Sequence, residues 1–158
     1  MIEWYWKRFN ELTVGELYSV LHARATVFVV EQRCVYTDID NLDKQAWHLF
    51  AIDTDASHKP LVAYARVFGP DPESGDTRIG RVLTVSEYRD RGLGKALLQR
   101  ALQHVETNWP GTAIRLSAQQ YLRAFYESFG FSKMSGPYLE DGIPHLDMRR
   151  AKSASASS

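Results

Sequence analysis

The sequence predicts an α/β protein built on one mixed sheet, with the element order β-α-β-β-β-α-β-α-β-β. Three features of the chain support this fold class. Helical and strand patterns alternate, three consecutive strands are joined only by short turns, and one helical crossover links residue 85 to residue 113. Strands joined by short turns pair antiparallel, whereas a helical crossover joins parallel strands. We therefore expect a sheet that is parallel beside the crossover and antiparallel elsewhere.

The first half of the chain is expected to contain one helix and four strands. Residues 2–8 alternate between polar and apolar side chains, as in a half-buried strand. Thr13 and Glu16 form a capping box, and the helical spacing of apolar residues behind them runs to Glu31 or Gln32. Three further strands, separated by turns rich in Gly, Pro and Asp, are predicted at residues 47–53, 61–68 and 77–85.

The segment 34–45 between the first helix and the second strand has no apolar repeat. It carries short polar side chains, namely Asp38, Asp40, Asn41 and Asp43. We expect a loop or a short helix here. Charges in such a segment are more typical of a solvated loop than of a substrate clamp.

The second half is expected to read helix, strand, helix, strand and strand. Apolar residues at every fourth position from Leu93 to Val105 mark one face of the first helix, which ends at Trp109. The remaining four elements are predicted at residues 113–118, 121–129, 131–138 and 143–149. We expect residues 1–150 to form one domain, and the Ala- and Ser-rich residues 151–158 to be a low-complexity, disordered tail.

The composition argues against several classes of function. Lys plus Arg and Asp plus Glu both number 19, so a nucleic-acid binder, which would carry a basic excess, is not expected. The longest apolar run, Ala25 to Val30, is too short to span a bilayer, and charges at residues 3–8 interrupt any signal peptide. Cys34 is the only cysteine, which fits a reducing cytoplasm. The histidines match no zinc spacing, so no metal is expected.

The segment from Arg89 to Ala96 carries the clearest functional signal. Two glycines one residue apart, Gly92 and Gly94, allow a tight turn and a close approach of the backbone to a ligand. The helix that starts behind them presents unpaired N–H groups, and cationic side chains surround the same turn. A P-loop and a dinucleotide fingerprint are excluded, because Arg89 and Leu97 stand where each motif needs a glycine. A pyrophosphate site remains.

A second motif follows the strand at residues 113–118. Residues 125–131 read Phe-Tyr-x-x-x-Gly-Phe, with Tyr126 as the second residue. Leu122, Phe125, Tyr126 and Phe129 share one helical face, which taken alone is more typical of core packing than of catalysis. The phosphate loop upstream favours the functional interpretation.

Together the two motifs, Arg-x-x-Gly-x-Gly and Phe-Tyr-x-x-x-Gly-Phe, resemble those of the GNAT acetyltransferase superfamily, whose element order also matches. The resemblance implies an acetyl-CoA-dependent N-acyltransferase fold and activity. Further segments look like the ElaA-like bacterial branch of that superfamily, namely residues 2–4, 27–32, 36–40, 63–66 and 140–145. That branch has no well-defined acceptor, so an amine of a small molecule, a lysine side chain or a protein N-terminus all stay open.

The resemblance also implies roles for particular residues. Tyr126 would lie beside the sulfur of acetyl-CoA and assist the leaving thiolate. The backbone of Leu83 and Val85, freed from the sheet by a splay between strands, would pair with the pantetheine arm. The cofactor-binding set is expected to be Leu83, Thr84, Val85, Arg89, Arg91, Gly92, Leu93, Gly94, Lys95 and Tyr126.

A general base is needed because an ordinary amine, with a pKa of ~10.4, is protonated at neutral pH. We rank Glu31 and His145 first, ahead of the other candidates Asp38, Asp40, His48, Glu140 and Asp141. Acidic residues near the expected acceptor side favour a cationic acceptor. The alternative hypothesis is a non-catalytic acyl-CoA-binding regulatory module on the same fold. Many members of the superfamily are dimers, so a homodimer is open.

Overall fold

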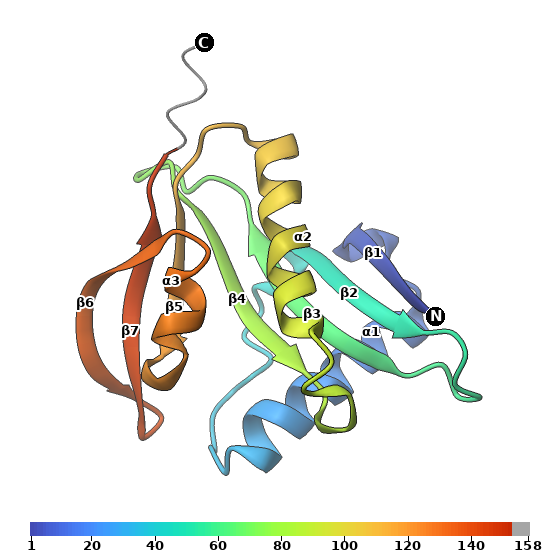
Figure 1. Cartoon of the computed structure of the whole chain (residues 1–158). Coiled ribbons are helices and arrows are strands. Elements are labelled where there is room, and N and C mark those ends of the chain that lie inside the picture. Colours follow the sequence, from blue (N-terminus) through green and yellow to red (C-terminus); the bar gives the residue numbers. More distant parts are fainter. Residues whose placement is uncertain (153–158) are drawn as a thin grey trace.

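The computed structural model describes residues 1–152 and contains one seven-stranded mixed sheet (Figure 1). The strands lie side by side in the order β1-β2-β3-β4-β5-β7-β6. Their bounds are Ile2–Arg8 (β1), Trp47–Asp53 (β2), Leu61–Phe68 (β3), Thr77–Thr84 (β4), Ile114–Gln119 (β5), Phe131–Glu140 (β6) and Ile143–Arg150 (β7). The expected fold class and element order are confirmed. Residues 153–158 of the predicted tail lie outside the described residues.

The sheet consists of two antiparallel halves joined by a short parallel contact. β1 to β4 form the expected antiparallel meander, and β5, β7 and β6 form a second antiparallel set. The parallel pairing of β4 with β5 is limited to Thr77 and Arg78 opposite Ile114 and Arg115. Beyond these residues the two strands diverge toward the bottom of the view in Figure 1. The splay that the family resemblance implied is therefore present.

The first helix begins where the capping box predicts. The Thr13 hydroxyl accepts from the Glu16 N–H at 3.0 Å, and the Glu16 carboxylate accepts from the Thr13 N–H at 2.9 Å. The regular helix α1 covers Val14–Arg24 and continues as a wider π-helical segment, Ala25–Glu31. α2 covers Leu93–Asn108. The helix expected at residues 121–129 is shorter, because a 3-10 turn precedes the regular part, α3, at Arg123–Glu127.

Two apolar cores lie on opposite faces of the sheet. On one face α2 packs against β2, β3 and β4, and Leu49 of β2 belongs to this core. On the other face α1 packs against β3, and Phe50 of β2 belongs to that core. Adjacent strand residues point to opposite faces, which explains why Leu49 and Phe50 enter different cores. The two helices therefore cover opposite faces of the sheet, and the place where β4 and β5 diverge lies between them.

The acidic segment at residues 34–45 is the main departure from the sequence prediction. Asp38 and Asp43 are buried, at 7% and 6% exposure, instead of solvated. The fully buried Arg24 donates from Nε to Asp38 at 3.0 Å and from Nη1 to Asp43 at 2.6 Å. The expectation of a solvated loop is wrong, because arginines distant in sequence converge on these carboxylates, namely Arg24, Arg66 and Arg81.

The same ion pairs fix the segment to the sheet. Arg66 of β3 binds both carboxylate oxygens of Asp40 at 2.8 Å, and Arg81 of β4 binds Asp38 at 2.8 Å. The Nε of Arg66 is buried and has no hydrogen-bond partner among residues 1–152. The segment is thus a fixed wall beside the diverging strands, and we call these six side chains the Arg–Asp network: Arg24, Arg66, Arg81, Asp38, Asp40 and Asp43.

Acid is expected to destabilise the protein through this network. Burial alone would raise the pKa of Asp40, but hydrogen bonds from Arg66 and the Leu42 N–H outweigh burial and lower that pKa to about 2. A carboxyl group with a lowered folded-state pKa stabilises the fold above its unfolded pKa of ~3.9 and loses this contribution as pH falls to the folded value. We expect Asp40 to account for a loss of about 2 kcal/mol in unfolding free energy between about pH 5 and pH 2.

Urea denaturation across this pH range measures the loss. The Asp40→Asn variant cannot titrate at this position, so its unfolding free energy should fall less steeply than that of the wild type. Equal slopes for the two proteins would contradict the prediction.

Candidate active site

A cleft of about 1150 Å³ lies where β4 and β5 diverge. Its cause is visible in the register of β3 and β4, where Tyr64 pairs with Leu83 but Arg66 pairs with Gly80. One extra residue of β4 therefore forms a β-bulge, and Arg81 within it has a positive φ of 51°. A bulge bends the strand that carries it and ends regular pairing. The bend carries β4 away from β5 and opens the sheet.

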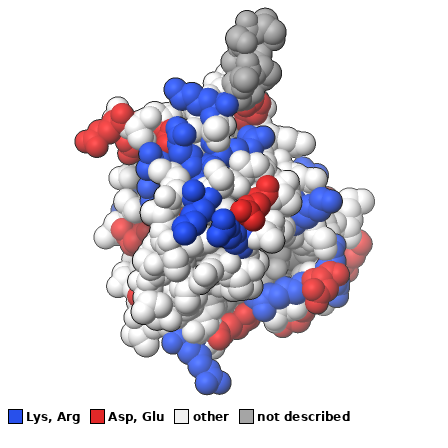
Figure 2. Space-filling view, turned by 60° about the vertical axis from the view of Figure 1, so that its left-hand side comes forward, with Lys and Arg blue, Asp and Glu red and all other residues white. Residues whose placement is uncertain are grey.

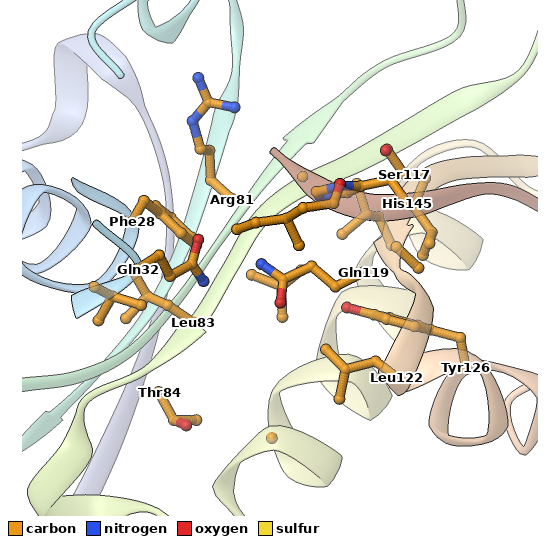
Figure 3. A pocket seen from close by; sticks show the side chains of 18 of the residues that line it. Phe28, Gln32, Arg81, Leu83, Thr84, Ser117, Gln119, Leu122, Tyr126 and His145 are labelled. Carbon is orange, nitrogen blue, oxygen red and sulfur yellow. The ribbon is translucent and has the colours of Figure 1, made fainter. Parts of the chain in front are cut away.

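Figure 3 shows side chains converging on this cleft from both halves of the sheet. One wall carries residues from the end of the first helix and from β4, among them Phe28, Gln32, Arg81, Leu83 and Thr84. The facing wall carries residues from β5, from α3 and the 3-10 turn before it, and from β7, among them Ser117, Gln119, Leu122, Tyr126 and His145.

The predicted phosphate loop borders the cleft. Gly92 is left-handed, with φ 75°, and no side chain caps the helix α2 that follows. The first helical hydrogen bond is donated by Ala96 to Gly92, and the N–H groups of Leu93, Gly94 and Lys95 have no partner among the described residues. A Cβ placed on Gly92 or Gly94 would meet no atom within 4 Å, so the space above these N–H groups is open.

The cationic side chains of this loop are unequally placed. Arg89 and Lys95 line the cleft, whereas Arg91 lies over the ring of Tyr88, with 4.5 Å between its Cζ and the ring centroid. Arg89 donates from Nε to the Thr84 carbonyl at 3.1 Å and from Nη2 to Glu31 at 2.7 Å. An open space rimmed by free N–H groups and two cations fits a diphosphate group.

In β4 the residue whose backbone groups point away from β3 differs from the expected ones. The Val85 N–H is not free, because it donates to the Val62 carbonyl of β3 at 3.0 Å. Hydrogen-bonded pairs alternate along an antiparallel ladder, so Leu83, two residues before Val85, also turns its backbone groups toward β3. The Thr84 carbonyl instead points away from β3, where Arg89 donates to it. The expectation for Leu83 and Val85 is corrected: the side chain of Leu83 lines the cleft, but the carbonyl that points away from β3 is that of Thr84, and it accepts from Arg89.

Tyr126 combines a packed ring with a free hydroxyl. The side chain is 5% exposed, and the ring makes edge contacts with Phe125 and Phe131 at 5.2 and 6.1 Å between centroids. The hydroxyl has no hydrogen-bond partner among residues 1–152, and in Figure 3 it points into the cleft. Burial raises the pKa of Tyr126 to about 12. The phenol therefore keeps its proton at neutral pH and can donate it to a group in the cleft.

His145 is held with one ring nitrogen free to accept a proton. The side chain borders the cleft, and Nδ1 lies 2.7 Å from the Ile143 carbonyl oxygen. A carbonyl only accepts, so Nδ1 carries the proton and Nε2 of the neutral ring has a free lone pair. Nε2 faces the Glu140 carboxylate at 3.4 Å. Neither atom can donate to the other while the ring is neutral, so the pair is arranged to receive a proton.

The other base candidates separate into two groups. Glu31 and Asp141 line the cleft, but the Glu31 carboxylate is already paired with Arg89. Asp38 and Asp40 belong to the Arg–Asp network and do not border the cleft. His48 is fully buried, and its ring nitrogens contact Tyr64 and the Asp43 carbonyl. Geometry therefore leaves His145, Glu140 and Asp141 as the cleft-lining candidates whose acceptor atoms have no cationic partner among residues 1–152, and His145 is the one of them that carries a ring nitrogen with a free lone pair.

The sequence did not reveal the polar side chains on the floor of the cleft. Gln32 and Gln119 have no side-chain hydrogen bonds to residues 1–152, and Ser117 bonds to Tyr138 at 2.6 Å. Alternation along strand β5 puts Ser117 and Gln119 on the same face. No local signal in the sequence separates such residues from ordinary strand surface.

Charge on the outside of the molecule is mixed. Figure 2 shows basic side chains gathering on the upper half of the face with β6 and β7, interrupted by a few carboxylates, and a largely uncharged area at lower left. In the described part of the chain no group of three or more His, Cys, Asp or Glu side chains is placed to hold a metal ion. No described helix is long and apolar enough to cross a membrane.

Comparison with known proteins identifies the family. Residues 18–152 match the acetyltransferase (GNAT) domain. The chain belongs to the GNAT acetyltransferase family. Protein ElaA of Escherichia coli is 40% identical over 152 residues, which cover 95% of this chain and 97% of ElaA, and its crystal structure matches with a TM-score of 0.88. The ElaA-like resemblance is therefore confirmed.

Solved structures of other GNAT proteins extend the comparison. An acyl-CoA N-acyltransferase from Pseudomonas aeruginosa is 43% identical, with a TM-score of 0.89 and coverage of 96% of this chain and 100% of that one. An aminoglycoside 6'-N-acetyltransferase complexed with coenzyme A is only 11% identical, with a TM-score of 0.68 and coverage of 92% and 95%. That second likeness shows the shared fold alone. The coenzyme A in that structure belongs to the aminoglycoside acetyltransferase.

Proposed function

We propose that this protein is an N-acetyltransferase that transfers an acetyl group from acetyl-CoA directly to an amine acceptor. One observation carries the proposal: a single cleft combines the free N–H groups behind Gly92 with the unpartnered hydroxyl of Tyr126 and the free Nε2 of His145. The acyl-CoA N-acyltransferase of Pseudomonas aeruginosa, a similar protein, supports acyl-CoA as the donor.

The donor would be held at three places along the cleft. The N–H groups of Leu93, Gly94 and Lys95, with Arg89 and Lys95, would bind the diphosphate. The Thr84 carbonyl, which points away from β3, would accept from an amide N–H of the pantetheine arm in place of Arg89. When the donor binds, Arg89 would give up its hydrogen bonds to the Thr84 carbonyl and the Glu31 carboxylate and would donate to the phosphate oxygens instead.

The reaction removes two protons from the protonated acceptor nitrogen and needs the departing sulfur to be stabilised. The acceptor loses a proton to Nε2 of His145, its nitrogen forms a bond to the acetyl carbon, and the carbon–sulfur bond breaks. Tyr126 donates a hydrogen bond, and then its proton or that of a water, to the departing sulfur. The second proton of the nitrogen leaves to solvent. A donor that strengthens its hydrogen bond as sulfur becomes anionic favours the transition state over the ground state.

Two measurements test the proposal. Calorimetry should detect binding of acetyl-CoA, and a panel of amines should release free thiol from acetyl-CoA in an acceptor-dependent manner. Binding without thiol release from any amine would favour the non-catalytic acyl-CoA-binding module. Absence of binding to acetyl-CoA and to coenzyme A would overturn both functions.

The Gly94→Ala variant separates ligand binding from folding. Position 94 lies in the first turn of α2 without a positive φ, so alanine should stabilise the protein by about 0.5–1 kcal/mol through helix propensity. The added methyl group fills the open space above the free N–H groups, so acetyl-CoA affinity should fall about tenfold. Thermal unfolding and calorimetry measure the two effects. A stabilised variant with unchanged affinity for acetyl-CoA would mean that the diphosphate does not bind at this turn.

A further inference from the structure

A chain of hydroxyl groups leads from the cleft to a carboxylate. Ser117 Oγ, on the cleft floor, lies 2.6 Å from Tyr138 Oη. Tyr138 Oη in turn donates to Oδ1 of Asp147 at 2.9 Å. The second oxygen of Asp147 accepts from Ser135 at 2.8 Å. The chain crosses three strands, β5, β6 and β7, and ends on a carboxylate that has no cationic partner within 4.0 Å among residues 1–152.

The direction of these hydrogen bonds is fixed by the carboxylate. An ionised carboxylate only accepts, so the single hydrogen of the Tyr138 hydroxyl is used toward Asp147. Burial raises the pKa of Tyr138, and the bond to Asp147 acts in the same direction, so the phenol keeps this hydrogen. Tyr138 must then accept the hydrogen of Ser117. Ser117 Oγ consequently presents only lone pairs to the cleft.

The neighbouring groups also lack a hydrogen to donate. Nε2 of His145 has a free lone pair, and the Glu140 carboxylate faces it at 3.4 Å. Ser117 lies opposite Asp147, and His145 lies opposite Gln119, which makes Ser117 and His145 diagonal neighbours on one face of the sheet. Diagonal neighbours lie roughly 7–8 Å apart, so one nitrogen between their side chains can hydrogen-bond to both.

We propose that Ser117, His145 and Glu140 form a subsite for a primary alkylammonium group, with Tyr138 and Asp147 as positioning residues. An ammonium group has three donors and no acceptor, which matches three acceptor atoms and two carboxylates without a cationic partner. A hydroxyl group offers a single hydrogen and carries no charge to offset the two carboxylates. The inference rests on the acyl transfer proposed above and specifies its acceptor as a cation that enters the cleft protonated.

Binding of small probes to the protein saturated with coenzyme A tests this subsite. n-Butylammonium should bind at least about tenfold more tightly than n-butanol, which has the same chain without the charge. Equal affinities, or no detectable binding of n-butylammonium, would overturn the subsite. Saturation with coenzyme A is measured first, so a failure of the proposed function appears as absent coenzyme A binding and is distinct from a failure of the subsite.

Variants of the chain sharpen the test. Tyr138→Phe removes the acceptor of the Ser117 hydrogen, and Asp147→Leu removes the acceptor of the Tyr138 hydrogen, which can then turn toward Ser117. In both variants the Ser117 hydrogen can point into the cleft, so each should weaken n-butylammonium binding about tenfold and leave coenzyme A binding unchanged. Ser135→Ala is the matched control, because Ser135 contacts the other oxygen of Asp147 and should leave the preference for the cation unchanged. Ser117→Ala should lose that preference and Ser117→Thr, which keeps the hydroxyl, should retain it. If Ser135→Ala also lost the preference for the cation, the effects of the Tyr138 and Asp147 variants would be merely structural, and the proposed positioning role would be contradicted.

Discussion

Replacing Arg24 by methionine is expected to lower the free energy of unfolding by about 3 kcal/mol or more. The side chain is fully buried and makes three hydrogen bonds, to the Asp38 carboxylate, the Asp43 carboxylate and the Asp38 carbonyl. Methionine fills a similar volume but leaves these acceptors buried with fewer partners. Removing one member of a buried ionic cluster costs about 3–5 kcal/mol, because the remaining charge has lost its compensation.

Urea denaturation and thermal unfolding measure this effect, and the melting temperature should fall by about 10 °C. The matched control is Arg123→Met, which removes an exposed ion pair with Glu127 at 48% and 44% side-chain exposure. Exposed pairs of this kind contribute less than about 1 kcal/mol. A loss in Arg24→Met no larger than in this control would mean that the Arg–Asp network adds nothing to stability.

The Arg–Asp network is also the part of the fold that could not be predicted from the sequence. Strand ends were predicted within two residues, because alternation and turn residues are local. The capping box located the start of α1 for the same reason. A run of acidic residues, however, looks the same in a sequence whether it is solvated or buried. Its burial depends on arginines 24, 66 and 81, which only the folded sheet brings together.

The candidate site shows the same division. That the Gly92–Gly94 turn and Tyr126 border one cleft could be predicted, because each lies in a short motif. The direction of the backbone groups of β4 could not be predicted, since a one-residue bulge decides whether Leu83 or Thr84 turns its N–H and C=O groups toward the cleft. Ser117, Tyr138 and Asp147 come from three strands, and their contact depends on a register that no single segment encodes.

Tyr126→Phe is expected to lower kcat about a hundredfold while acetyl-CoA affinity stays nearly unchanged. The hydroxyl is the only polar atom removed, and it has no hydrogen-bond partner in the described chain, so stability should not fall. Loss of one preorganised donor to a developing anion costs roughly this much in rate. Single-turnover thiol release and calorimetry measure the two quantities. An unchanged kcat would remove Tyr126 from the mechanism.

The pH dependence of the loss in rate distinguishes the role of Tyr126 from that of His145. A base matters only while the acceptor is protonated, so the deficit of His145→Gln should shrink as pH approaches the ~10.4 of an ordinary amine. The pKa of Tyr126 is about 12, so its hydroxyl still donates at that pH and the deficit of Tyr126→Phe should persist. Rate profiles of both variants, each divided by the wild-type rate at the same pH, show the contrast. Parallel profiles would assign both residues to one step, and the division into base and thiolate donor would fail.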